Sequence, residues 1–394
     1  MTDAAASRRV LLLQGPRSPF FARLADALTA RGAAVTRVLF CPGDALFWRG
    51  RPAISFRGRR ADWPAFFAAA LRDFGATDVV ALGDGRWAHR EGFALARAAG
   101  ARVHVVEQGW LRPGWLTLEP DALGAWRPDP AAPPAPAPQA PQYRASFAAF
   151  AAMDVAHHLA NFALGPFSYP HHRSHELVHP AREWAGWLSK TARWPARRAA
   201  CARTLAQIDA ATGPLFLFAL QLETDFQIRD HGPEGGLRAA LAQTLASFRR
   251  AAPPGARLIV KPHPLDPGLT PWRPLAQEAL YLDGGALEAL YPRLSGVVTV
   301  NSTVGLSALR AGVAVATLGR AVYEGLAHRG PLDAFWRSAA PPDPARVAAF
   351  AGQMARAVQT PGAFDGEGMA AGAAGVAAMI LRGKIGRASC RERV

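Results

Sequence analysis

The segments ARLIVKPHPLDPGL (256–269) and GVVTVNSTVGLSALRAGVAVATLG (296–319) contain the two apolar runs that decide the fold. Arg257–Val260 is short and aliphatic, and it stops at Lys261-Pro262-His263-Pro264. Gly296–Val300 is a second such run, and it stops at Asn301-Ser302-Thr303. Runs of this length between turn residues are typical of buried parallel strands, so the sequence predicts an α/β fold.

Polar residues follow both predicted strands at their carboxyl ends, where ligands bind in open α/β sheets. We expect the two strands to be neighbours, which would bring the Lys-Pro-His-Pro turn beside the Asn-Ser-Thr cluster. Ser302 or Thr303 can cap a helix over Gly305–Ala311, and a capped helix N-terminus binds anions. The two motifs therefore predict a phosphate site formed by Lys261, His263, Pro264, Asn301, Ser302 and Thr303. A rigid turn and a helix cap without a ligand are the alternative for either motif alone.

The length of 394 residues, with 50% apolar content, allows two hydrophobic cores. No apolar run reaches the ~18–20 residues of a membrane span. The run near the N-terminus, Val10–Leu13, is too short for a signal-peptide core, so we expect a cytoplasmic protein. The three cysteines, Cys41, Cys201 and Cys390, are too widely spaced to indicate a disulfide framework or a zinc site.

The formal net charge of +15 is carried mainly by arginine, because lysine occurs only at positions 190, 261 and 384. A basic surface suits an anionic lipid, a nucleotide or an acidic sugar. It also suits nucleic acid, but the usual nucleic-acid-binding motifs are absent from the sequence, and we exclude that class. Residues Lys384–Val394 resemble the translation of a sequencing adapter, and we expect them to be a non-native tail.

Residues 1–126 are expected to form an N-terminal Rossmann-like domain. A strand over Val10–Leu13, a helix that ends near Arg31 and a strand over Val35–Leu39 make a βαβ unit. Further strands over Asp78–Leu82 and Arg102–Val106 also end in polar residues. Residues just past the predicted strands are candidate substrate-binding residues, namely Gln14, Gly15 and Asp84 here and Gln221 and Arg229 after a later strand over Leu215–Leu220.

The segment EQGWLRPGWLTLE (107–119) supplies the candidate catalytic groups. Glu107 stands at the carboxyl end of a predicted strand, Glu119 closes the segment, and Arg112 lies between them. Two carboxylates near arginine and tryptophan can act as nucleophile and acid/base in sugar chemistry. A pair of surface glutamates in salt bridges is the alternative.

The middle of the chain is expected to connect two domains. Residues 127–142 form a proline-rich linker, and residues 143–212 form a helical connecting segment. Spacings of three and four indicate a helix facing an anionic membrane surface, formed by Trp187, Lys190, Trp194, Arg197 and Arg198. Pro195 would kink or restart that helix, and a packed connecting helix is the alternative.

The rest of the chain is expected to hold a C-terminal Rossmann-like domain over residues 213–340 and closing helices over residues 341–383. The histidines near position 172 lack carboxylate or cysteine partners at metal-ligand spacing. The sequence therefore predicts no metal site.

Seven motifs occur in order along the chain: LLLQGPRSPFFARLADAL, CPGDALFWRGRP, GDGRWAHR, VEQGWLRPGWLTLE, QLETDFQIRDHGP, KPHPLDPGL and VTVNSTVGLSAL. Together they resemble the KpsS-type capsule polysaccharide biosynthesis/export proteins, which are β-Kdo glycosyltransferases. The resemblance extends from Val10 to about Ala340.

The resemblance implies a GT-B-like fold, with two Rossmann-like domains and a cleft between them. It implies transfer of Kdo from CMP-β-Kdo to a phosphatidylglycerol-type lipid, with no cofactor and with retention through a carboxylate nucleophile. His263-Pro264 and Asn301-Ser302-Thr303 match the motifs that bind CMP. The family pattern has two adjacent acids before the glycine at 109, but the second position here is Gln108, so we favour Glu107 as the nucleophile.

The same resemblance implies a peripheral location at the inner face of a bacterial inner membrane, beside other capsule assembly proteins. Two alternatives stay open at this point. One is a GT-B glycosyltransferase that uses another nucleotide sugar, and the other is a non-catalytic scaffold for capsule assembly or export.

Overall fold

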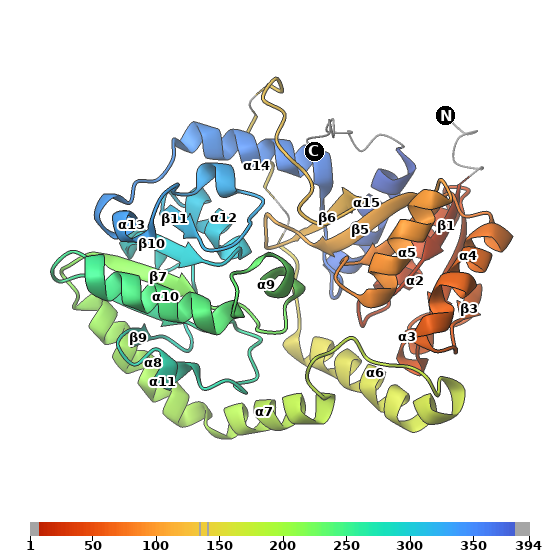
Figure 1. The fold of residues 1–394 in the computed structure, drawn as a ribbon, viewed down its shortest axis with the longest axis horizontal. Coiled ribbons are helices and arrows are strands. Elements are labelled where there is room, and N and C mark those ends of the chain that lie inside the picture. Colours follow the sequence, from red (N-terminus) through yellow and green to blue (C-terminus); the bar gives the residue numbers. More distant parts are fainter. Residues whose placement is uncertain (1–7, 134, 140–141, 383–394) are drawn as a thin grey trace. The chain divides into compact units, whose positions relative to one another are not determined.

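The computed structural model describes residues 8–133, 135–139 and 142–382, in two compact units. Unit 1 holds Met1–His175 and Ala351–Val394, and unit 2 holds Glu176–Phe350. Each unit is built on its own mainly parallel sheet (Figure 1). The predicted α/β fold with two Rossmann-like domains is confirmed, while the cleft between them stays a prediction.

The sheet of unit 1 has the strand order β12-β6-β5-β4-β1-β2-β3. Only β6 runs antiparallel to its neighbours, β5 and β12. The strands are β1 (Arg9–Leu12), β2 (Ala34–Leu39), β3 (Ala53–Ser55), β4 (Asp78–Leu82), β5 (Arg102–Gln108), β6 (Trp115–Pro120) and β12 (Gln359–Pro361). The helices are α2 (Phe20–Thr29), α3 (Pro42–Leu46), α4 (Trp63–Phe74), α5 (Trp87–Ala98), α6 (Phe147–Ser168) and α15 (Gly368–Leu381).

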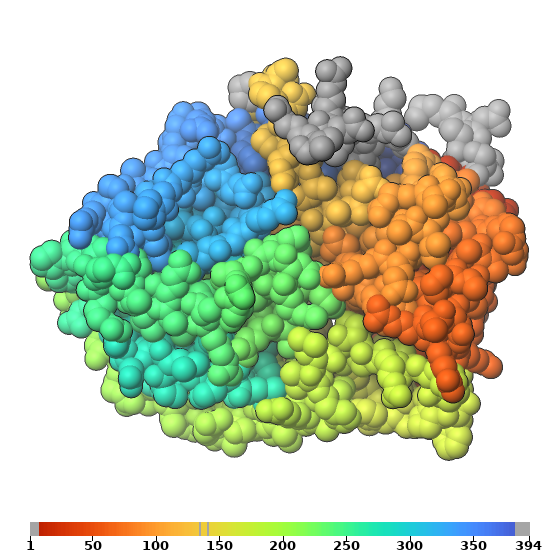
Figure 2. Space-filling view, viewed as in Figure 1, coloured from red at the N-terminus to blue at the C-terminus, as the bar shows by residue number. Residues whose placement is uncertain are grey.

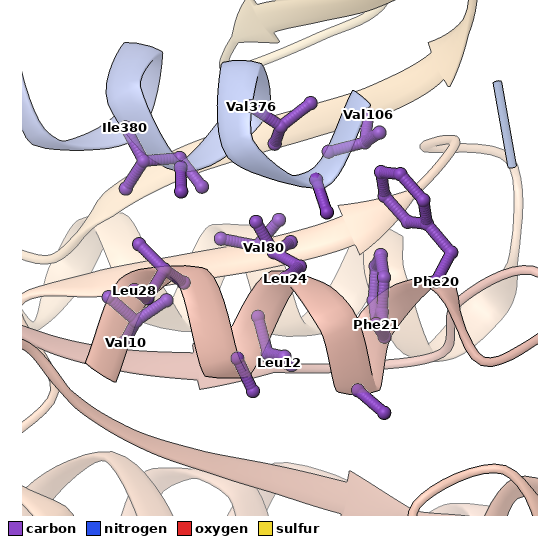
Figure 3. Packing of buried hydrophobic residues seen from close by; sticks show 14 of the residues in the cluster. Val10, Leu12, Phe20, Phe21, Leu24, Leu28, Val80, Val106, Val376 and Ile380 are labelled. Carbon is purple, nitrogen blue, oxygen red and sulfur yellow. The ribbon is translucent and has the colours of Figure 1, made fainter. Parts of the chain in front are cut away.

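The core of unit 1 joins an early and a late part of the described chain. Alternate strand residues such as Val10 and Val80 point to one face of the sheet, where they meet the apolar stripe of α2, including Leu24 (Figure 3). Val376 and Ile380 of α15 complete the same buried cluster. The C-terminal helix is therefore part of the N-terminal sheet's core.

The five strands of unit 2 are all parallel, in the order β11-β10-β7-β8-β9. They are β7 (Leu215–Ala219), β8 (Arg257–Lys261), β9 (Leu280–Tyr281), β10 (Leu294–Thr299) and β11 (Ala314–Thr317). The helices are α7 (Pro180–Ala192), α8 (Trp194–Asp209), α9 (Phe226–His231), α10 (Gly236–Ala251), α11 (Trp272–Leu275), α12 (Thr303–Arg310) and α13 (Leu332–Ser338), and the division between units falls inside α14 (Pro344–Val358).

The strand order of unit 2 corrects one expectation. β8 and β10 were predicted to be neighbours, but β7 lies between them. The chain builds outward from β7 to β8 and β9, and it then returns to the other side of β7 for β10 and β11. The winding therefore reverses between β7 and β10, and by the same logic between β1 and β4 in unit 1. Ligands bind at such switch points in open α/β sheets.

The predicted domain boundaries need correction. The proline-rich segment 127–142 stays within unit 1, where the Asp129 backbone N–H donates to Gln353 Oε1 at 3.0 Å. The expected connecting segment 143–212 divides, because α6 belongs to unit 1 whereas α7 and α8 belong to unit 2. The short or antiparallel strands β3, β6, β9 and β12 were missed because their sequences lack a long apolar run. The expected tail at 384–394 lies outside the described residues.

The single helix expected to face the membrane is divided into two helices, α7 and α8, both of which belong to unit 2. The new helix α8 begins at Trp194, with Pro195 in its first turn, in line with the expected restart. Lys190 Nζ donates to the Asp266 carbonyl at 2.6 Å, and Arg197 makes two bonds to Asp283 at 2.7 and 2.8 Å. These contacts fit the alternative of packed connecting helices, and the membrane-facing role stays a prediction. Within the described part of the chain, no helix combines the length and the apolar character that a bilayer span requires.

Candidate functional site

The switch point of unit 2 brings Gln221 and Asn301 together. Gln221 follows β7 and Asn301 follows β10, and both side chains are buried. Gln221 Nε2 donates to Asn301 Oδ1 at 2.9 Å, and Gln221 Oε1 accepts the Asn301 backbone N–H at 3.2 Å. Asn301 Nδ2 also donates to the Gln227 carbonyl at 2.9 Å. These bonds satisfy the two amides and hold the two strand ends in register.

The helix α12 begins at this switch point. Ser302 is its N-cap, with Oγ accepting the Val304 backbone N–H at 3.2 Å, which confirms the predicted cap. The Tyr323 hydroxyl donates to the Ser302 carbonyl. Thr303 opens the first turn, whose backbone N–H groups and positive dipole end favour an anion. An added Cβ at Gly305 would lie 2.2 Å from the Tyr323 hydroxyl oxygen, so this first turn requires glycine.

The Lys-Pro-His-Pro turn follows β8, on the other side of β7. Lys261 Nζ donates to the carbonyls of Gly284 and Gly285, the latter at 2.9 Å, and burial lowers the Lys261 pKa. His263 Nδ1 accepts the Leu265 backbone N–H at 3.1 Å. In the neutral ring this bond places the proton on Nε2. Pro264 is exposed, and it helps to set the shape of the turn.

Arg229 lies on α9, just past the end of β7. Its guanidinium sits 5.2 Å from the centroid of the Phe226 ring. It borders a surface hollow of about 490 Å³ together with Glu223 and Arg238. This hollow is polar and contains charges of both signs.

The switch point of unit 1 gathers three further predicted residues. The Gln14 carbonyl accepts the Leu82 backbone N–H at 3.0 Å, which joins the ends of β1 and β4. Gly15 has no room for a side chain, because a Cβ there would lie 2.6 Å from the Phe21 ring. Asp84 Oδ2 accepts the Leu123 backbone N–H at 2.9 Å. These three residues shape the strand ends through contacts within unit 1.

Glu107 lies at the carboxyl end of β5, beside the same switch point. Its Oε1 accepts the Gln108 backbone N–H at 2.9 Å, and an added Cβ at Gly83 would lie 3.3 Å from its Oε2. Glu107 is partly accessible. Arg112 Nε donates to the Gly109 carbonyl at 3.2 Å in the hairpin turn between β5 and β6.

Glu119 does not reach the same surface, although the register of β5 and β6 places it near Glu107. Its side chain is fully buried and accepts three bonds, from Trp110 Nε1 at 2.8 Å and from the backbone N–H groups of Gly124 and Trp126 at 3.0 and 2.8 Å. Burial raises its pKa, and these donors act in the opposite direction. A carboxylate so enclosed anchors the loop after β6, which corrects the expectation of a catalytic role.

Sequence reasoning missed a group of charges at this edge of unit 1. Burial lowers the pKa of Arg86 to about 10, with opposing effects from Asp44 and Glu107 and reinforcing effects from Arg17 and Arg37. Arg37 is itself buried on β2 and donates to Asp44 Oδ1 at 3.1 Å. The available signal was Arg86 in the GDGR motif directly after β4. Arg86 therefore adds a positive charge near Glu107.

Two histidines in unit 1, the fully buried His89 and the partly buried His157, stay neutral at pH 7. Burial, assisted by Arg86, lowers the His89 pKa to about 3. Burial also lowers the His157 pKa to about 4. Among the residues that the structure describes, no group of three or more histidine, cysteine, aspartate or glutamate side chains is placed to hold a metal ion.

Comparison with known proteins finds relatives that are named for capsule polysaccharide export or modification. The chain is 28% identical over 366 residues to the capsule polysaccharide export protein KpsS of Escherichia coli, covering 87% of this chain and 93% of that protein. It is 29% identical over 368 residues to the capsule polysaccharide modification protein LipB of Neisseria meningitidis serogroup B, covering 86% and 87%.

Among solved structures, the Thermosulfurimonas dismutans KpsC, beta Kdo 2,7 transferase, aligns with 90% of this chain and 92% of its own, at 12% identity and a TM-score of 0.43. The family model described as "Capsule polysaccharide biosynthesis protein" matches residues 77–364, which is well over half of the chain. The protein described here therefore belongs to the capsule polysaccharide biosynthesis protein family.

Proposed function

We propose that this protein is a glycosyltransferase that moves Kdo from CMP-β-Kdo onto a phosphatidylglycerol-type lipid. The product would be the linker on which capsular polysaccharide is built, at the inner face of the inner membrane and beside other capsule assembly proteins. The observation that carries the proposal is the start of α12 at the switch point of unit 2, capped by Ser302 and braced by Gln221 and Asn301. Family membership and the ordered sequence motifs support the same reading.

The proposed donor site uses unit 2. The CMP phosphate would bind at the N-terminus of α12, where Ser302 and Thr303 present hydroxyl and backbone donors. His263 Nε2–H would donate to the leaving phosphate. Lys261 would then act through its bonds to the carbonyls of Gly284 and Gly285, by fixing the shape of the neighbouring loop.

The proposed chemistry uses Glu107 of unit 1. Its carboxylate would attack the anomeric carbon of Kdo, forming an ester while the bond from that carbon to the CMP phosphate oxygen breaks and CMP leaves. An acceptor hydroxyl would then displace Glu107 and lose its proton, so that the anomeric configuration is retained. Arginines are the natural partners for the Kdo carboxylate, and Arg86, Arg112 and Arg229 are the candidates.

The test is an assay of CMP release and product mass with purified protein, CMP-Kdo and a short-chain phosphatidylglycerol. Glu107→Gln and His263→Ala are each expected to lower transfer by about 100-fold or more. Gln108→Glu is the informative companion, because it restores the second acid of the family pattern. If Gln108→Glu raises transfer while Glu107→Gln is harmless, the nucleophile assignment is wrong.

Two outcomes would replace the proposal. CMP or UDP release only with CMP-sialate or a UDP-sugar would identify another nucleotide sugar as donor. Capsule assembly in cells that survives both Glu107→Ala and His263→Ala would point to a non-catalytic scaffold.

A further inference from the structure

The helix α6 presents its polar residues inward. Asn161 Oδ1 accepts the Gly43 backbone N–H of α3 at 2.8 Å, and Asp154 pairs with Arg17. The His157 ring stacks on Phe47, with centroids 6.5 Å apart, and His158 is buried. All polar side chains in the middle of the helix are therefore taken up by unit 1.

The opposite side of α6 presents apolar residues outward. Leu159 is 53% exposed and Phe167 is 87% exposed, and Val155 and Phe162 are exposed on the same stretch of helix. Leu159 lies on the side of the helix away from Asp154 and Asn161, whereas Val155 and Phe162 flank that side, with the Phe162 ring 6.4 Å from the His158 ring. Figure 2 shows α6, in yellow, at the surface of the molecule. A surface helix of a water-soluble protein normally has the reverse arrangement, so this face marks an interaction site.

Arginines stand near the C-terminal end of this face, whereas at its N-terminal end the Arg144 backbone N–H donates to Glu367 Oε2 at 3.2 Å, so that end carries both signs of charge. Asp154 is the only carboxylate of α6, and it faces inward. Exposed arginines stand beyond both ends of the helix, with Arg144 before it and Arg173 after it. Arg57 is also exposed, and it lies over the ring of Tyr169, the residue that ends α6, at 5.6 Å from the centroid. An apolar strip with arginines at its C-terminal end is complementary to an anionic lipid surface.

We propose that α6 is the membrane-docking helix of this protein, lying flat in the interfacial layer of a bilayer that contains anionic lipid. The inward polar residues rule out insertion across the bilayer, in keeping with the finding that no described helix is long and apolar enough to span it. A lipid surface fits better than a protein partner, because the exposed side chains of the strip offer no hydrogen-bonding groups. This proposal rests on the proposed function, because transfer to a lipid acceptor is the reason why the protein would need a membrane surface.

The experiment uses the full chain and vesicles of neutral phosphatidylcholine, with or without about one third phosphatidylglycerol. The double variant Leu159→Glu/Phe162→Glu is expected to lower vesicle co-sedimentation by about 10-fold or more. Leu188→Glu on α7 is the matched control, because Leu188 is a similarly exposed leucine, at 72%, on a helix outside the strip. All variants should keep the wild-type circular dichroism and unfolding midpoint, because the changed side chains are exposed.

Each outcome supports or overturns the docking helix. Equal co-sedimentation of the double variant and the wild type overturns it, and so does equal binding to neutral and anionic vesicles. A concentration-dependent dimer that the double variant abolishes would assign the face to self-association instead. Failure of the proposed function looks different, because Kdo transfer would then be absent with every variant while vesicle binding still depended on α6. If both proposals hold, the double variant keeps transfer to a water-soluble short-chain acceptor and loses transfer to vesicle-bound lipid.

Discussion

His89 illustrates how a single side chain in this protein ties stability to pH. Its ring is fully buried behind the end of β4, and its Nδ1 lies 2.8 Å from the Gly83 carbonyl. Burial and the charge of Arg86 lower the His89 pKa to about 3, far below the value of about 6.5 in an unfolded chain. The folded state therefore disfavours the proton, and the unfolded state binds it first as pH falls.

The sign of the resulting pH dependence is fixed by that difference. The contribution of neutral His89 is fully present above pH 6.5 and is lost as pH falls from about 6.5 toward 3. We expect the free energy of unfolding, measured by urea titration, to fall by up to about 1.4 kcal/mol per pH unit per histidine in this window. His89→Asn should reduce the slope of the free energy of unfolding against pH by an amount that corresponds to about one bound proton. An unchanged slope in that variant would contradict the assignment, while His157, with a pKa of about 4, should keep part of the slope.

At the scale of single elements, α12 shows how a helix start is prepared for a ligand. Ser302 caps it, Tyr323 holds the Ser302 carbonyl, and the buried Gln221–Asn301 pair fixes the residue that precedes the cap. Gly305 lets the Tyr323 ring lie directly against the first turn. The same packing that stabilises α12 therefore also positions the N–H groups of the proposed phosphate site.

Gly305→Ala is expected to disturb this helix start. Its Cβ would meet the Tyr323 ring, so we expect a loss of about 1–3 kcal/mol in the free energy of unfolding. We also expect weaker CMP binding, by about 10-fold, in isothermal titration. Gly325→Ala is the matched control, because no atom lies within 4 Å of a Cβ at that position. Equal CMP affinity for both variants would argue against CMP binding at α12.

At the scale of the whole molecule, the chain leaves unit 1 after α6, builds unit 2 and returns to unit 1 through α14 and α15. The return places Val376 and Ile380 in the core that β1 and α2 begin (Figure 3). Unit 1 therefore depends on contacts between residues more than 350 positions apart, such as the bond from Arg8 to the Ile380 carbonyl at 2.8 Å. Unit 2 is continuous in sequence.

Two compact units predict two unfolding transitions in calorimetry. Val376→Asp should lower the free energy of unfolding for one of these transitions by several kcal/mol, on the order of 3–5, because it buries an unpaired charge in the core of unit 1. CMP at about 100 times its dissociation constant should raise the free energy of unfolding for the other transition by about 2.7 kcal/mol if CMP binds unit 2 alone. A CMP-dependent shift of the same transition that Val376→Asp affects would contradict the assignment of CMP binding to unit 2 alone.

Local sequence patterns determined much of what the structure contains. Apolar runs bounded by turn residues predicted β1, β4, β7, β8 and β10 to within about two residues, because strand burial and turn chemistry act over short windows. The cap at Ser302 and the helix restart at Pro195 were predicted for the same reason. The residues of the candidate site were found wherever they directly follow such a strand, as Gln221 and Asn301 do.

Tertiary structure alone decided which of these pieces meet. The insertion of β7 between β8 and β10, the burial of Glu119 and the return of α15 to unit 1 depend on contacts between distant residues. The outward apolar side of α6 was likewise not predictable from the sequence, because the residue pattern does not say which side of the helix the rest of unit 1 covers. Local free energies choose the elements, whereas the packing of one element against another chooses their order, their exposed faces and the side chains left accessible for chemistry.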